Sequence, residues 1–101
     1  MTLMQRIEYP LMASAPVAAS VGVASAEAVA ANPSRKALVL INTSANRISL
    51  AFGTEAAVLN SGITLFPSGG TWTMGPETFT TSAINAIAGG AASNVAIQEW
   101  T

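Results

Sequence analysis

The sequence predicts an all-β domain, a compact antiparallel β-sandwich or barrel with a short N-terminal arm. Short apolar segments are separated by turn residues at intervals of roughly 8–12 residues, which is the spacing of strands in such folds. Several segments alternate between apolar and small polar residues, the period of a strand with one buried face. No stretch has a helical pattern longer than about two turns. We therefore assign residues 1–15 to the arm and residues 16–101 to one β-sandwich or barrel domain.

The arm has no sustained periodicity and ends in a stretch of Ala and Ser. It nevertheless carries apolar side chains that a lone domain has little reason to keep, and we expect them to contact a capsid or another subunit. These residues are Leu3, Met4, Ile7, Tyr9, Leu11 and Met12. An arm of this kind is expected to become ordered when it binds its partner.

The first strand is predicted over residues 17–23, where Val recurs at every second position from Val17. Residues 26–31 are compatible either with a helical turn, because Ala favours helix, or with a second short strand. Asn32-Pro33 is a turn signal, since a residue before proline is driven toward extended geometry.

Residues 37–41 and 47–52 are predicted to form a hairpin around a polar turn at residues 42–46. With Ile41 opposite Arg47, one face of the hairpin becomes the core face, because a slip of one residue would expose it entirely. The core residues are Leu38, Leu40, Ile48, Leu50 and Phe52. The other face carries Val39, Ile41 and Arg47, and we expect these three to contact another chain.

Four further strands are predicted over residues 63–66, 71–74, 83–88 and 94–100. They are separated by turn-forming sequences, namely Pro67-Ser68-Gly69-Gly70, Gly75-Pro76 and Gly89-Gly90. No helical pattern follows these glycines, so they are turn residues rather than a phosphate-binding loop.

The composition argues against an enzyme. The chain has no Cys, no His and no Asp, which removes the usual zinc, copper and iron ligands and every catalytic arrangement based on imidazole or thiolate. The five glutamates lie in different segments without a second catalytic feature, so we interpret them as solvated charges. We expect no cofactor and no metal.

Charge and hydropathy also limit the partners. A net charge of -1 offers no basic surface for nucleic acid. The charge-free stretches are broken by Gly, Pro and Ser, so we expect no membrane segment. Only 9% of the residues are charged, against about 25% in a typical domain. Because buried interfaces are depleted of charge, we expect a homo-oligomer, and a trimer in particular, with Arg35, Lys36 and Arg47 pairing with glutamates of a neighbour at its rim.

The two tryptophans are compatible with a second function, glycan binding. Trp72 and Trp100 could stack on a sugar ring, as in a tail- or fibre-associated glycan-binding module, or they could anchor a core or an interface. Their exposure distinguishes these roles.

The order of several motifs resembles small virion proteins of tailed bacteriophages, of the capsid decoration, cement or head-fibre type. The motifs are residues 30–42, Phe52-Gly53, residues 62–65 with Pro67-Ser68-Gly69, residues 84–88 and residues 95–100. The resemblance covers residues 17–101 and implies a compact β domain, commonly a trimer, on the outside of a capsid. It implies a structural protein assembled in the host cytoplasm that binds the major capsid protein and stabilises the shell, with no catalytic residues. The Ala-rich N-terminal third departs from the family pattern and leaves the mode of attachment open.

Overall fold

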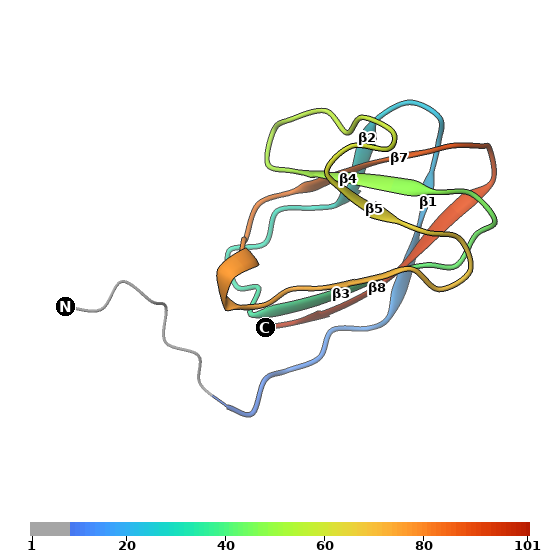
Figure 1. The fold of residues 1–101 in the computed structure, drawn as a ribbon. Helices are drawn as coiled ribbons and strands as arrows, with labels where there is room; N and C mark the ends of the chain where they lie inside the picture. Colours follow the sequence, from blue (N-terminus) through green and yellow to red (C-terminus); the bar gives the residue numbers. More distant parts are fainter. Residues whose placement is uncertain (1–8) are drawn as a thin grey trace.

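The computed structural model describes residues 9–101, and they form eight strands and one short 3-10 helix (Figure 1). The elements are β1 (Val17–Val21), β2 (Ala26–Val29), β3 (Ala37–Asn42), β4 (Ile48–Phe52), β5 (Ile63–Leu65), β6 (Thr71–Thr73), η1 (Pro76–Thr78), β7 (Ile84–Ala88) and β8 (Ser93–Trp100). Residues 26–29 thus form a strand rather than a helical turn. Within this described part, no helix is long and apolar enough to cross a membrane.

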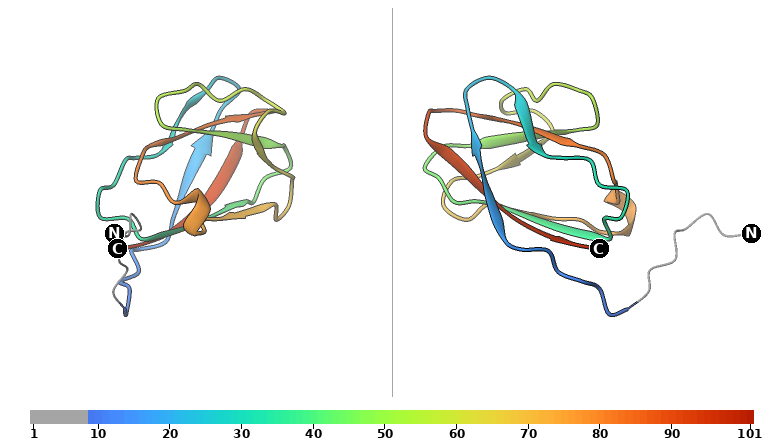
Figure 2. Two further views of the ribbon diagram at one scale, coloured as in Figure 1. Left: turned by 60° about the vertical axis from the view of Figure 1, so that its left-hand side comes forward. Right: turned by 180° about the vertical axis from the view of Figure 1, so that it is seen from behind.

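The strands form two antiparallel four-stranded sheets that pack face to face as a sandwich, as the sequence predicts (Figures 1 and 2). We call them sheet A, in the order β1-β8-β3-β6, and sheet B, in the order β2-β7-β4-β5. Neither sheet closes into a barrel. The connections between β1 and β2 and between β5 and β6 cross from one sheet to the other, at opposite edges of the sandwich.

The core lies between the sheets and is built by alternate residues of each strand. β3 and β7 alternate regularly between buried and half-buried positions. The largest fully buried apolar side chains are Leu38, Leu40, Ile48, Ile84 and Val95. Leu50 is buried as well, whereas Phe52 at the end of β4 is half-buried and packs against Trp72 with ring centroids 5.1 Å apart.

The predicted hairpin of residues 37–52 is wrong. β3 belongs to sheet A, where Leu38 pairs with Glu99 and Leu40 with Ile97, and β4 belongs to sheet B, where Ile48 pairs with Ala88. The leucines of β3 therefore meet the apolar residues of β4 across the core rather than along one sheet. Residue alternation shows which side of a strand is buried, but a sandwich and a hairpin bury the same side chains.

A buried asparagine explains why the chain crosses between the sheets after β3. The Asn42 side chain donates to the carbonyl oxygens of Asn46 at 2.7 Å and Leu65 at 3.0 Å. Its oxygen accepts hydrogen bonds from the backbone N–H and the hydroxyl of Ser44. Asn42 thus uses both N–H donors and its carbonyl to hold the β3–β4 crossover against the end of β5, in place of a tight hairpin turn.

The last part of the predicted arm extends the edge of sheet A. Met12 and Thr101 exchange backbone hydrogen bonds, and Ser14 donates to the carbonyl of Glu99 at 2.8 Å. Ala13 forms a bridge with Trp100. The segment before β1 therefore runs beside the end of β8 (Figure 2). Leu3, Met4 and Ile7, predicted as contact residues, lie outside the described residues.

Candidate functional site

The outer face of sheet A carries no charged side chain. Strand registers place its outward residues in rows across the sheet: Thr71, Ile41, Ala96 and Ala18 form one row, and Thr73, Val39 and Gln98 the next. Ser20, Asn94, Ala37 and Trp100 complete the face toward its two ends. Apolar, hydroxyl and amide side chains thus make up this face of the sheet.

The outer face of sheet B is covered by the chain itself. Residues 53–62 run across it (Figure 1), and the backbone N–H of Asn60 donates to the Ser49 hydroxyl at 2.8 Å. The Asn85 side chain donates to the carbonyl of Glu55 at 2.7 Å. As a result Ser49, although it points outward from β4, is fully buried. The two outer faces therefore differ in the described part of the chain: residues 53–62 cover sheet B, and no described segment covers sheet A in this way.

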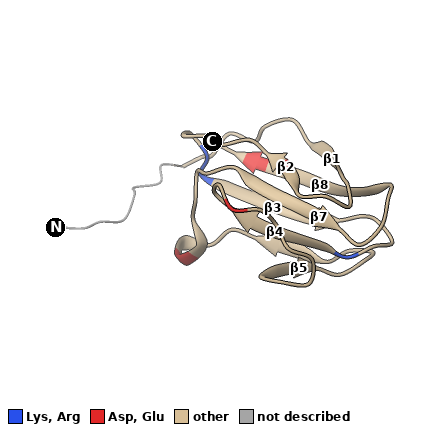
Figure 3. Cartoon of the chain, turned by 90° about the horizontal axis from the view of Figure 1, so that it is seen from above, with Lys and Arg blue, Asp and Glu red and all other residues tan. Residues whose placement is uncertain are grey.

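Most of the remaining charges of the described residues lie on sheet B or in connecting segments (Figure 3), whereas Lys36 is half-buried directly before β3 of sheet A. Glu27 is on β2, Glu77 is in η1, and Arg47 and Glu55 are exposed in connecting segments. Arg47 donates to the side-chain oxygen of Asn60 at 3.1 Å. Among the described residues, no three acidic side chains lie close enough together to hold a metal ion.

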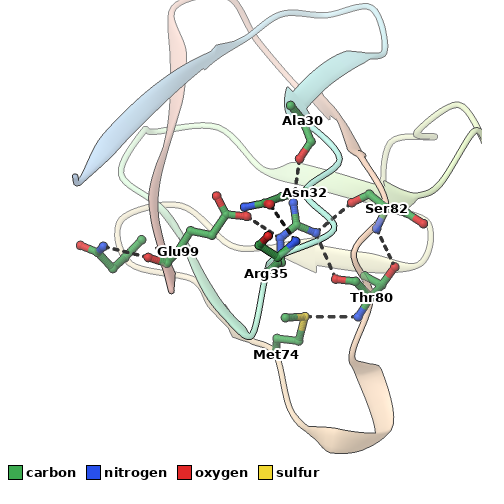
Figure 4. A network of polar contacts seen from close by, with 9 residues as sticks. Ala30, Asn32, Arg35, Met74, Thr80, Ser82 and Glu99 are labelled. Carbon is green, nitrogen blue, oxygen red and sulfur yellow. Dashed lines mark hydrogen bonds and ion pairs between the residues drawn. The ribbon is translucent and has the colours of Figure 1, made fainter. Parts of the chain in front are cut away.

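Arg35 is fully buried and forms the densest polar network of the described chain (Figure 4). Its Nε donates to Oε2 of Glu99 at 2.5 Å, and its Nη2 donates to the carbonyl of Ala30 at 2.7 Å. Its Nη1 donates to the carbonyls of Thr80 and Ser82 at 3.1 and 2.9 Å. The guanidinium thereby joins the segment after β2, the segment before β7 and the end of β8.

This network is structural. Every contact of the guanidinium is a carboxylate or carbonyl oxygen of the same chain, and no buried side-chain nitrogen or oxygen among the described residues lacks a partner. The expectation that Arg35 pairs with a neighbouring subunit at an oligomer rim is therefore wrong. Arg35 is buried because it alone can satisfy the carbonyls gathered at this end of the sandwich, through its five fixed donors.

A second feature is an apolar hollow of about 310 Å³ at the edge where β5 and β6 meet. It is lined by Phe52, Ile63, Trp72 and Phe79, with Glu77 and two threonines at its rim. Trp72 points inward from β6 and is half-buried, so only part of its ring is available to a ligand. Trp100, in contrast, lies on the outer face of sheet A beside Ala37.

The structure brings together only some of the predicted contact residues. Val39 and Ile41 lie side by side on the outer face of sheet A, whereas Arg47 lies in the crossover to sheet B, so the three do not share a face. Tyr9 and Met12 are 77% and 68% exposed, and Leu11 is half-buried.

No family model matches the chain, and neither the curated proteins nor the solved structures contain a match.

Proposed function

We propose that this protein is a structural virion subunit that binds the outer surface of a tailed-phage capsid and stabilises the shell. The observation that carries the proposal is the uncharged outer face of sheet A, which is free of cover while sheet B is covered by residues 53–62. The motif resemblance to capsid decoration proteins supplies the class of partner.

The chemistry of this face suits a protein partner. Its amide and hydroxyl side chains can exchange hydrogen bonds with a capsid surface, and Val39, Ile41 and Trp100 supply apolar area. With no charge to desolvate, the contact avoids the cost of burying an unpaired ion. Met12, hydrogen-bonded to Thr101 beside this face, extends the surface with an exposed apolar side chain.

The test places one charge at the centre of the face. Ala96 lies between Ile41 and Ala18, so Ala96→Lys would put an ammonium group inside the proposed contact. We expect at least a tenfold loss of binding to capsids assembled from the major capsid protein of the same genome, measured by co-sedimentation.

A matched control separates this effect from a general effect of charge. Ala56→Lys adds the same charge at an exposed position of residues 53–62, on the opposite side of the sandwich, and should bind capsids normally. Equal binding of both variants, at unchanged melting temperature, would contradict the proposal for this face. If the protein without substitutions does not co-sediment with capsids, the proposed function itself is contradicted.

The hollow at Trp72 favours a second candidate, a tail- or fibre-associated glycan-binding module. An aromatic wall beside Glu77 and two threonines combines a stacking surface with polar groups for sugar hydroxyls. This candidate requires glycans to perturb tryptophan fluorescence in the natural protein but not in Trp72→Phe. A glycan array without a hit would remove it.

A further inference from the structure

The four sheet edges of this sandwich are unequally protected. β5 and β6 are edges of only three residues each. β2 carries Glu27 and a register irregularity between Glu27 and Val29. Short strands, charges, prolines and bulges are devices by which proteins prevent a free edge from pairing with another chain. β1, the remaining edge, has none of them within its five residues, which are uncharged and pair with β8 in unbroken register, and Pro16 stands just outside it.

The sequence of β1 is also nearly the same in both directions. It is Val-Ala-Ala-Ser-Val, so reversal exchanges only one Ala with one Ser. We propose that β1 pairs in antiparallel fashion with β1 of a second copy, about a two-fold axis through Ala19. Val17 then lies opposite Val21 of the other copy, and Ala18 lies opposite Ser20.

The side chains fit this pairing on both sides of the sheet. Ala18 and Ser20 point outward and are small, so the two backbones can approach without obstruction. On the inner side Val17 is 55% exposed, whereas Val21 is buried. The pairing places the exposed Val17 at the position opposite Val21 of the other copy, next to the edge of that copy's core. Pro16, which has no N–H, ends the ladder on one side.

A second copy fits this edge better than an unrelated extended segment does. In a self-pair about Ala19 the residues that face each other must be compatible, and the opposite residues of β1 are small or apolar and uncharged at all five positions. Two-fold pairing also limits the assembly to a dimer, because the β1 edge of each copy is occupied by the other copy and is not free to bind a third. The sequence-based expectation of a trimer does not follow from this edge.

The inference rests on the proposed function in one respect, the size of the binding face. Four strands about 4.8 Å apart, from roughly 10 Å long in β6 to roughly 26 Å in β8, give one outer face a footprint of roughly 350 Å². A stable interface needs about 800 Å² on each partner. Pairing through β1 joins two uncharged faces into one eight-stranded surface of about the required size.

The first test is the mass of the free protein by analytical ultracentrifugation, without capsids. We expect about twice the 10.2 kDa of one chain at micromolar concentration. In Ala18→Lys/Ser20→Lys each lysine faces a lysine of the other copy, and we expect association to weaken at least about tenfold. Ala18→Lys/Ser20→Glu should restore it, because Lys then faces Glu in both pairs. Thr71→Lys/Thr73→Lys, with the same charge at the β6 edge, should stay paired.

A second test reads the register directly. The chain has no cysteine, and in the proposed pair residue 18 lies directly opposite residue 20, at roughly 5.5 Å between Cα atoms. An equal mixture of Ala18→Cys and Ser20→Cys should oxidise to a disulfide-linked dimer. Each variant alone should do so poorly, because like positions lie roughly 9 Å apart, beyond disulfide reach.

Three results would overturn the pairing. They are a mass of one chain or of three, a lysine variant that associates normally, and equal cross-linking of each cysteine variant alone. If the protein does not dimerise through β1, its binding to capsids can still be measured by co-sedimentation. If it dimerises but does not bind capsids, the proposed function is contradicted and the dimer is not.

Discussion

Arg35 satisfies backbone groups that the sandwich leaves without strand partners. The carbonyls of Ala30, Thr80 and Ser82 converge on one guanidinium at the end of the molecule where β2 leaves the sheet and β7 enters it. Glu99 neutralises the buried charge and is itself only 19% exposed. The pair replaces backbone hydrogen bonds that an irregular segment cannot form.

We expect Arg35→Met to lower the free energy of unfolding by roughly 3–5 kcal/mol, since it leaves a carboxylate and three carbonyls without donors. Glu99→Gln keeps an oxygen for Nε of Arg35 but removes the charge that balances the buried guanidinium, so it should cost at least about 2 kcal/mol. Urea denaturation of both variants and of the double variant measures the coupling. A loss below about 1 kcal/mol in Arg35→Met, with no coupling in the double variant, would show that the network contributes little.

At the scale of elements, the decisive feature is the pair of crossovers that join the two sheets beside Asn42. The backbone N–H of Asn42 donates to the carbonyl of Gly70, and its carbonyl accepts from Gly69, both at 2.8 Å. Its side chain reaches Asn46 and Leu65. One residue at the end of β3 thus fixes both the β3–β4 and the β5–β6 crossover, and with them the positions of two strands in each sheet.

Asn42→Asp tests this role with almost no change in shape. Oxygen replaces the two-donor nitrogen, so the carbonyls of Asn46 and Leu65 face a lone pair, and we expect a loss of roughly 2–5 kcal/mol in unfolding free energy. Asn32→Asp is the matched control, because Asn32 acts as an acceptor for the Ser34 N–H, which Asp preserves. It should change stability by less than about 0.5 kcal/mol. Similar melting temperatures for Asn42→Asp and Asn32→Asp would refute this role of Asn42.

The alternation of apolar residues predicts the fold class, the strands and the burial of Leu38, Leu40, Ile48 and Leu50, because burial depends only on the strand period. The alternation does not predict which strands pair with each other. β3 pairs with β6 and β8, which are distant in the sequence, and no local pattern specifies such pairs. The same limit applies to the site. Val39 and Ile41 could be placed on an outer face, whereas the cover over Ser49 and the unprotected edge at β1 depend on the sheet order.

At the scale of the whole molecule, most charges of the described residues lie away from the outer face of sheet A. Glu27, Arg47 and Glu55 lie on sheet B or its connections, and the single ion pair of the described residues is the buried one between Arg35 and Glu99. Among the described residues, Lys36 directly before β3 is the charge next to this face, so a contact made through the strands of sheet A brings few charges of the described chain close to the capsid.

This arrangement predicts capsid binding that resists salt. Between about 0.05 and 0.5 M NaCl, where exposed charges become screened, we expect the dissociation constant to change less than about threefold. Co-sedimentation across this range measures it, with Ala96→Glu as a variant whose residual binding should become salt-dependent. Release of the natural protein by modest salt would show that the contact is ionic.

The place of β8 in sheet A has a consequence for biosynthesis. β8 is the last strand of the sandwich to leave the ribosome, yet it lies in the interior of sheet A and supplies the hydrogen-bonding partner of β1 and one of the two partners of β3. β1 and β3, which are synthesised earlier, cannot complete their pairing before β8 has been made. The pairing of β1 with β8 joins residues at opposite ends of the domain. Folding of the sandwich is thus expected to wait until β8 has been made and to be slow for this length, with β1 unpaired on both sides until then. In that interval its uncharged edge is open to other nascent copies emerging from the same message.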